Sequence, residues 1–201
     1  MYANTRLFLF IGMLIAPLCA CHPTELPPEG LAAYINNPSN GVSQTQRIGQ
    51  TQVSVTYQPP DLLVMRELQN GSISLRAVDS LRGKYSHSIY FLLSIAHNGR
   101  EVLQPKEGFA QYSDLLQTLS FHMDQHVCLI TSRGDTLRPV NYYLDRTYAA
   151  GRASQLLFAF TEVPSTGTWQ FYLLECGLQT GSVSFAFDTE AIRKVPAMTI
   201  H

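Results

Sequence analysis

The sequence lacks the features that most often reveal what a chain does. It has no Gly-x-Ser-x-Gly or Ser-x-x-Lys pattern, so the common signatures of hydrolases with a serine nucleophile are missing. It has no concentrated basic segment, which leaves nucleic-acid binding without support. Its apolar run at residues 7–20 is shorter than the roughly 20 residues that a membrane-spanning helix needs. Internal repeats and low-complexity segments are also missing, so we expect a globular chain.

The N-terminal residues carry the most specific signal in the chain. One positive charge, at Arg6, precedes an apolar core at residues 7–16. An apolar core of about ten residues behind a positive charge is typical of a secretory signal peptide. We therefore predict that residues 1–20 are a signal peptide rather than a membrane anchor.

The end of this signal resembles the lipobox of bacterial lipoproteins. Residues 18–21 read Leu-Cys-Ala-Cys, which follows the lipobox order of Leu, a tolerant position, a small residue and the lipid-bearing Cys. The resemblance implies that Cys21 receives lipid and becomes the first residue of the mature protein. Cys19 is the competing candidate, but Leu18 before it is too bulky for the small-residue position. Ordinary secretory cleavage near Ala20, which would leave Cys21 free, is the alternative.

The mature chain has the length of one domain. Removal of 20 of the 201 residues leaves 181, enough to bury most of the apolar surface around a single core. Only one charged residue lies in the signal, so the mature chain has 13 basic and 15 acidic side chains. Residues 21–30 contain three prolines, which favour an extended tether over a helix. We predict this tether and then one globular domain at residues 31–201.

The apolar pattern of this domain predicts an α+β fold that is rich in strands. Period-two alternation and short apolar runs indicate strands, and apolar residues three and four apart indicate helices. Residues 89–95 are apolar on both faces, so we expect this strand to be the most buried element. The predicted strands are residues 53–57, 88–96, 127–131, 137–144, 156–163, 169–178 and 183–187. The predicted helices are residues 31–37, 61–68 and 108–125, and residues 72–82 fit a strand or a helix.

Turn residues indicate how the later strands are joined. Gly134 and Asp135 mark one hairpin turn, and Pro-Ser-Thr-Gly at residues 164–167 marks another. Consecutive hairpins build antiparallel sheet. We therefore expect an antiparallel meander in the C-terminal half, covered on one side by the helix at residues 108–125.

Segments at both ends of the domain resemble uncharacterised lipoproteins of the Gram-negative cell envelope. They are residues 31–41, Leu-Ala-Ala-Tyr-Ile-Asn-Asn-Pro-Ser-Asn-Gly, then residues 53–61, and Phe-Ala-Phe at residues 185–187 with residues 192–196. The resemblance leaves the middle of the chain uncovered and supplies no activity. It implies a lipid-anchored envelope protein rather than a secreted enzyme. We predict that the anchor lies in the bacterial outer membrane, on the periplasmic face, with surface exposure left open.

Two classes of function fit these observations. The first is a non-catalytic envelope lipoprotein that binds or scaffolds a protein or glycan partner at the membrane surface. The second is a periplasmic hydrolase or metal-dependent enzyme whose site follows no known motif. We favour the first because the catalytic spacings are missing, and we expect no cofactor and no nucleic-acid partner.

Two segments are candidates for a binding or metal site. The loop at residues 145–152 brings Arg146, Tyr148 and Arg152 together, and two guanidinium groups with a Tyr suit an anionic partner. A merely solvated loop is the alternative. His122 and His126 are four residues apart on the predicted helix, a spacing that suits zinc. The motif is incomplete because no Glu follows the first His and no third ligand is marked, so we predict no metal site.

Two cysteines and two hydroxyl side chains are candidates for covalent modification. Cys128 and Cys176 are the two thiols that remain after processing, and an oxidising compartment favours a disulfide between them. Both lie in apolar strands, where a free Cys also packs as a small apolar residue, but we expect the bridge. Asp-Ser-Leu around Ser80 and Asp-Thr-Leu around Thr136 resemble the O-glycosylation acceptor of some anaerobic bacteria. The resemblance implies sugar at these two positions wherever they are exposed.

Overall fold

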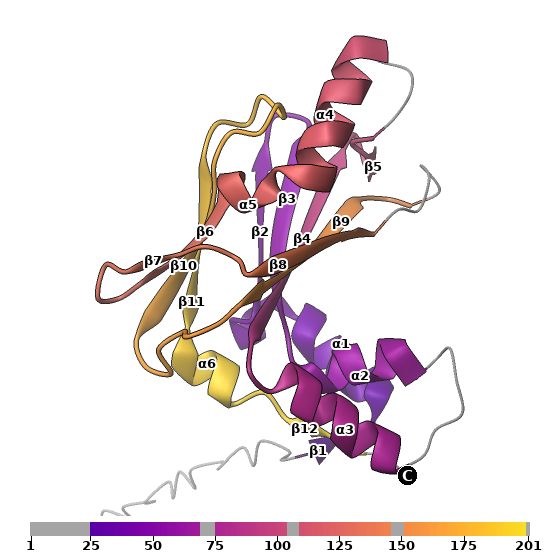
Figure 1. Cartoon of the computed structure of the whole chain (residues 1–201), viewed down its shortest axis with the longest axis vertical. Helices are drawn as coiled ribbons and strands as arrows, with labels where there is room; N and C mark the ends of the chain where they lie inside the picture. The colour runs from indigo at the N-terminus through magenta and orange to yellow at the C-terminus, as the bar shows by residue number, and fades with distance from the viewer. Residues whose placement is uncertain (1–24, 69–74, 104–108, 146–150, 200–201) are drawn as a thin grey trace, which may run out of the picture.

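The structure is a computed structural model, and it describes residues 25–68, 75–103, 109–145 and 151–199. Figure 1 shows two β-sheets that face each other, with most of the helices at one end of the pair and the others along one side. Within the described residues, no helix is both long enough and apolar enough to cross a membrane. The strands pair almost entirely in antiparallel fashion, which confirms the predicted α+β class.

The larger sheet holds the strand that we expected to be the most buried. Its spatial order is β2 (Ser43–Ile48), β3 (Thr51–Gln58), β4 (Ile89–His97), β9 (Ser154–Phe160) and β8 (Asn141–Asp145), with β5 (Arg100–Glu101) also paired to β4. Strand β4 lies between two neighbours, and Phe91, Leu93 and Ile95 on its inner face are fully buried. The expectation of a central strand at residues 88–96 is therefore confirmed.

The smaller sheet lies opposite and supplies the other half of the core. Its spatial order is β11 (Val183–Asp188), β10 (Thr168–Leu173), β6 (Val127–Thr131) and β7 (Thr136–Leu137). The predicted hairpin at Gly134 and Asp135 is confirmed, because β6 and β7 pair directly across it. Alternate residues of β10 and β11 point inward, so the two sheets interdigitate as in a sandwich.

Phe91 lies at the centre of the core between the sheets. Its ring centroid is 4.9 Å from that of Phe187, 5.6 Å from Phe171 and 6.1 Å from Tyr57. Tilted and edge-to-face pairs of this kind add to the stability that burial alone provides. One aromatic side chain from β4 thereby joins the larger sheet to β10 and β11 of the smaller one.

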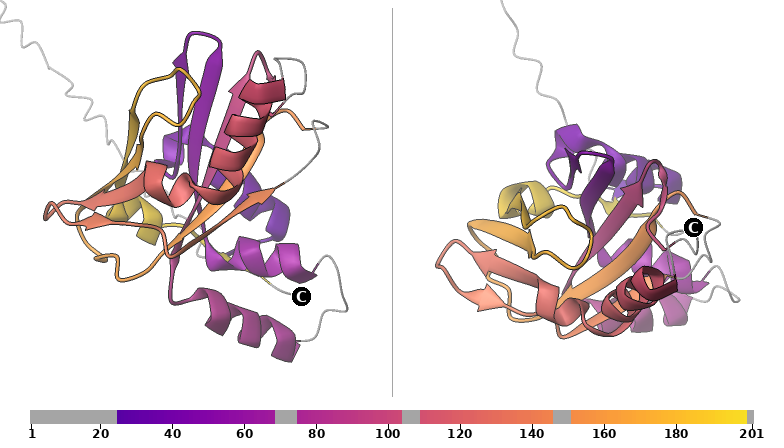
Figure 2. Two further views of the ribbon diagram at one scale, coloured as in Figure 1. Left: turned by 45° about the horizontal axis from the view of Figure 1, so that its top comes forward. Right: turned by 90° about the horizontal axis from the view of Figure 1, so that it is seen from above.

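The two long sides of the sandwich are closed in different ways. On one side, the Gln44 and Gln46 side chains of β2 donate hydrogen bonds to the Ala186 and Ser184 carbonyls of β11. On the other side, α4 (Phe109–Phe121) and α5 (Met123–His126) lie next to β8, as the view from above in Figure 2 shows. Leu119 and Met123 of these helices are fully buried in the core.

Three helices gather at the lower end in Figure 1, and we call this the helical end. They are α1 (Pro28–Asn36), α2 (Pro60–Leu68) and α3 (Leu75–Tyr85), beside the short parallel pair β1 (Glu25–Leu26) and β12 (Ala197–Met198). The Asp61 carboxylate joins these elements, since it accepts from Arg82 Nε at 2.7 Å and from the Met198 backbone N–H at 2.8 Å. A 3₁₀ turn at Pro38–Asn40 follows α1, and α6 (Thr189–Arg193) follows β11.

The extended tether that we predicted at residues 21–30 is shorter than expected. From Glu25 onward the chain is folded, because β1 pairs with β12 and helix α1 begins at Pro28. Proline is accepted at the first position of a helix, where the missing N–H would have no intrahelical partner. The prediction that the prolines exclude a helix from this segment is therefore wrong at Pro28, where α1 begins.

Two predictions about the C-terminal half are wrong. Residues 164–167 do not form a hairpin turn, because β9 before them and β10 after them belong to different sheets. The single strand predicted at residues 137–144 is divided into β7 and β8, which also lie in different sheets. The ambiguous segment at residues 72–82 contains helix α3 in its described part.

Candidate functional site

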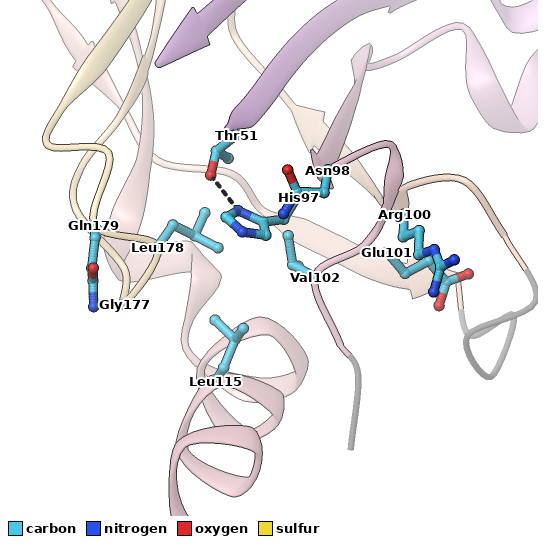
Figure 3. Close-up of a pocket in the computed structure, with 10 residues that line it drawn as sticks. All are labelled: Thr51, His97, Asn98, Arg100, Glu101, Val102, Leu115, Gly177, Leu178 and Gln179. Carbon is cyan, nitrogen blue, oxygen red and sulfur yellow. Dashed lines mark hydrogen bonds between the residues drawn. The ribbon is translucent and has the colours of Figure 1, made fainter. Parts of the chain in front are cut away.

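A cavity of about 550 Å³ lies at the end of the sandwich opposite the helical end, and we call it the end cavity. Figure 3 shows that its walls come from segments far apart in the sequence: the ends of β3 and β4, helix α4 and the loop after β10. Its polar lining residues are Thr51, His97, Asn98, Arg100, Glu101 and Gln179. Its apolar lining residues are Val102, Leu115 and Leu178. Ligand sites commonly combine these two kinds of surface at this size.

His97 and Thr51 form the best-defined polar pair in the end cavity. They lie directly opposite each other on β4 and β3, with their side chains on the inner face of the sheet. Thr51 Oγ1 lies 3.0 Å from His97 Nδ1, and the tautomer of the ring decides which atom donates. Figure 3 shows the imidazole ring between Leu178 and Val102. The hydrogen bond fixes the ring orientation and leaves the second ring nitrogen for a ligand.

The turn after His97 is held by a neighbouring hairpin. Asn98 and Gly99 have φ values of 51° and 73°, as a two-residue type I′ turn between β4 and β5 requires. The Asn98 backbone N–H donates to the Gln50 carbonyl at 3.0 Å, and the Asn98 side chain donates to Gln50 Oε1 at 3.1 Å. The rim of the end cavity is therefore fixed by hydrogen bonds rather than by packing alone.

The loop at residues 174–182 forms the opposite wall and is organised by Glu175. Its carboxylate accepts from the backbone N–H groups of Gly177 at 2.8 Å, Gln179 at 3.0 Å and Gly181 at 2.6 Å. Desolvation of Glu175 alone would raise its pKa, but these backbone donors outweigh that effect and lower the pKa. All three residues have positive φ, a conformation that the carboxylate stabilises. Leu178 and Gln179 are thereby held against the cavity.

Glu101 connects the end cavity to the loop that we predicted as a partner-binding segment. Its side chain is only 4 % exposed, and its Oε1 accepts from the Gly151 backbone N–H at 2.8 Å. Arg152 is exposed just beyond this contact. Arg146 and Tyr148 lie outside the described residues, so the proposed group of three remains a prediction.

Ser154 is a further polar group beneath the end cavity. It is 3 % exposed, and among the described residues its hydroxyl oxygen has no hydrogen-bond partner. It pairs with Ile95 on β4, one inner-face layer below the pair of Thr51 and His97. A buried hydroxyl without a partner costs stability, which is typical of a position where solvent or a ligand supplies the missing bond.

The histidine pair predicted on one helical face is divided by a helix break. His122 has φ −129° and ψ 7°, so α4 ends before it and the separate turn α5 carries His126. The four-residue spacing therefore does not lie on one continuous helix. No group of three or more His, Cys, Asp or Glu side chains suited to a metal ion occurs in the part of the chain that the structure describes.

The bridge predicted between Cys128 and Cys176 is not present in the structure, where both residues are buried free thiols. Val127 and Leu129 of β6 point into the core, so Cys128 between them points to the opposite face of the sheet. Cys176 instead belongs to the core cluster. A disulfide requires two side chains that point toward each other, and these two occupy different faces.

Both predicted glycosylation sites lie on the surface of the described chain. Ser80 on α3 and Thr136 on β7 are both exposed, which is the condition that we set for O-glycosylation. The glycosylation itself stays a prediction. Cys21 lies outside the described residues, and its lipid stays a prediction as well.

The polar groups of the end cavity can donate and accept hydrogen bonds. Among the described residues, the His97 ring hydrogen-bonds only Thr51. In the part of the chain that the structure describes, no carboxylate hydrogen-bonds this ring, unlike in the usual catalytic triad. The lining offers hydroxyl, amide and imidazole groups, one carboxylate and one guanidinium, beside the apolar side chains of Val102, Leu115 and Leu178. Sequence reasoning missed these residues, although His-Asn-Gly-Arg at residues 97–100 contains a hairpin-turn signal.

Comparisons with known proteins supply no function for this chain. The chain matches no protein-family model and no curated protein. A DUF4426 family protein from Pseudomonas aeruginosa is 11 % identical, with a TM-score of 0.39, over 72 % of this chain and 93 % of that one. A protein of unknown function from Burkholderia pseudomallei is 9 % identical, with a TM-score of 0.40, over 85 % of this chain and 94 % of that one.

Proposed function

We propose that this chain is a non-catalytic lipoprotein of the Gram-negative outer membrane, anchored at Cys21, and that it binds a protein or glycan partner in the end cavity. The end cavity is the observation that carries the proposal. Its hydrogen-bonding groups are fixed by Glu175, Gln50 and Thr51 before any partner arrives. Groups that are fixed in advance lose little conformational entropy on binding.

The position of the chain's first described strand supports this arrangement. Cys21 precedes Glu25 by four residues, which span at most about 14 Å when extended. Strand β1 begins at Glu25 and lies at the helical end, whereas the end cavity lies at the opposite end of the molecule (Figure 1). A lipid at Cys21 therefore turns the helical end toward the membrane and the cavity toward the envelope space.

The lining of the end cavity fits the proposed class of partner. Thr51, Asn98 and Gln179 are neutral groups that donate and accept hydrogen bonds. Such groups match the hydroxyls of a glycan or the backbone of a peptide without requiring a charged ligand. The Glu101 carboxylate and the Arg100 guanidinium add one charge of each sign, so the lining has no net charge from these two residues.

Site-specific photocrosslinking in living cells tests the proposed binding site. A benzophenone amino acid replaces Gln179 at the cavity wall, or Arg133 in the exposed β6–β7 turn as the matched control. We expect one discrete adduct from position 179 and none from position 133. We also expect His97→Ala to reduce the adduct while thermal unfolding stays unchanged. An adduct that His97→Ala leaves at full yield would place the partner elsewhere.

A separate variant tests the anchor. Cys21→Ser should leave the protein unprocessed or soluble, because no thiol remains to receive lipid. Membrane fractionation and intact-mass measurement of this variant give the result. Membrane association at the mass of the wild type, lipid included, would refute the anchor without bearing on the end cavity.

A further inference from the structure

A second hollow lies between the helical end and the outer face of the larger sheet. It consists of two cavities, of about 310 Å³ and 560 Å³, which share Arg66, Leu92 and Gln155 in their walls. Because three residues are common to both linings, the two cavities are neighbours, and we describe them together as one groove. We call it the lateral groove, and it is distinct from the end cavity.

The floor of the lateral groove is an apolar row that crosses three strands. Leu92 of β4 pairs with Leu157 of β9, and Leu157 pairs with Tyr143 of β8. The two leucines are half-buried, and Tyr143 is 66 % exposed at the end of the row. The next row toward the end cavity is polar, since it contains Gln155 and Asp145. The floor is therefore a narrow apolar strip with a polar border.

The opposite wall comes from the helices and combines apolar side chains with the polar Asn36, Arg66 and Glu67. Leu62, Leu63 and Met65 of α2 face the groove, with Ile35 of α1 on one side and Tyr85 of α3 on the other. Apolar surfaces of two layers normally pack against each other, because burial of each square ångström releases roughly 25 cal/mol. Here the two layers remain separated along the groove, which leaves apolar side chains of both layers open to a ligand.

One positive charge lies where the two cavities meet. Arg66 forms no ion pair among the described residues, and its Nη2 is 3.5 Å from Gln58 Oε1, the outer limit of a hydrogen bond. The neighbouring Glu67 is neutralised by Lys84 at 2.8 Å. Asp145, the other acid in the lining, belongs to the polar border of the floor. The lateral groove therefore has an exposed guanidinium without an ion pair among the described residues, in the wall that the two cavities share.

We propose that the lateral groove binds the acyl chain of a fatty acid, with its carboxylate at Arg66. The apolar strip from Leu92 to Tyr143 matches an unbranched hydrocarbon chain, and a planar guanidinium matches a carboxylate with two parallel hydrogen bonds. The combined size of the two cavities lies within the range of small-molecule sites, roughly 300 to 1,000 Å³. The inference rests on the proposed anchor only for the source of the ligand, since that anchor places the helical end at the membrane.

Photoaffinity labelling of the full chain in its native envelope tests this inference. Cells that express the protein receive a fatty acid with a diazirine on its chain, and labelled peptides are mapped after irradiation. We expect label on β9 and β8, around Leu157 and Tyr143. We expect Arg66→Gln to reduce labelling about tenfold, because a hydrogen bond to a charged group is lost. The matched control is Arg133→Gln in the β6–β7 turn, which should label as the wild type does.

Competitors identify what the groove recognises. An unlabelled fatty acid should abolish labelling, whereas the fatty alcohol of equal length should compete about tenfold less well because it carries no charge. A lysophospholipid that competes as well as the acid would show that the ligand is a membrane lipid instead. Labelling spread over the whole surface, or unaffected by Arg66→Gln in a folded variant, would overturn the inference. The same labelling of Cys21→Ser protein separates this result from failure of the anchor.

Discussion

The loop that walls the end cavity depends on one carboxylate, and Glu175→Gln tests that dependence. The glutamate accepts from three backbone N–H groups, two at Oε1 and one at Oε2. A glutamine keeps one acceptor oxygen and presents an NH₂ group where the second oxygen was. At least one backbone N–H of the loop therefore loses its partner, and the remaining bonds lose their charge assistance.

The expected cost is moderate because Glu175 is exposed. A hydrogen bond to a charged group contributes roughly 1.5–3 kcal/mol, and solvent screening at an exposed position reduces this to about 1–2 kcal/mol. Hydrogen exchange of the Gly177, Gln179 and Gly181 amides measures the local effect directly. We expect their exchange to become about 5- to 30-fold faster at neutral pH. Exchange in β4 should not change.

A matched substitution and the pH dependence complete this test. Glu190→Gln on α6 removes an exposed carboxylate of the same kind and should leave the loop amides unchanged. Because the pKa of Glu175 is lowered in the folded state, its contribution is present above the ordinary Glu pKa of 4.5 and is lost as pH falls through the lower folded value. Loop amides that exchange equally fast in wild type and Glu175→Gln would refute the role of this carboxylate.

Three further predictions concern the core, the helical end and the thiols. Phe91→Ala should lower the free energy of unfolding by about 3–5 kcal/mol, because it leaves a cavity surrounded by five aromatic rings. Denaturant titration measures this loss, and a loss below about 1 kcal/mol would contradict the prediction. By the same assay, Asp61→Ala should lower the free energy of unfolding by about 2–3 kcal/mol, mostly because it leaves the buried Met198 N–H unpaired. Glu67→Ala is the control and should lower it much less, because the ion pair of Glu67 is exposed. Burial raises the pKa of Cys176 to about 12 and also raises that of Cys128, so neither thiol should be alkylated in the native protein at pH 8. Denaturation without reductant should then give two modified cysteines, and the detection of none would establish a disulfide.

The sequence predicts those elements that are marked by a local run of apolar residues or by turn residues. Strand β4 and the hairpin at Gly134 were predicted because their apolar and turn residues act locally. Strand β2 was missed because its side chains are polar on both faces, and its partners include hydroxyl pairs such as Thr45 with Ser54. Such an edge strand lacks the alternation of apolar and polar residues by which a strand is recognised in a sequence.

Which sheet a strand joins was less predictable than the strand itself. The turn residues at 164–167 indicate that the chain changes direction. They do not distinguish a hairpin within one sheet from a connection that leads to the other sheet. In the structure the Trp169 indole N–H donates to the Pro164 carbonyl at 2.9 Å, a contact that fixes the crossing and has no sequence signature. The end cavity was hidden for the same reason, because Thr51 and Gln179 approach each other only after both sheets form.

The two glutamines that join β2 to β11 bear on how copies of this protein avoid one another. Each of these strands ends its sheet, and an outermost strand offers unused backbone groups to any passing chain. Gln44 and Gln46 occupy two of the β11 carbonyls with side-chain amides. A second molecule would have to displace both amides before it could pair with β11. The seam therefore raises a barrier to edge-to-edge aggregation between copies of the protein.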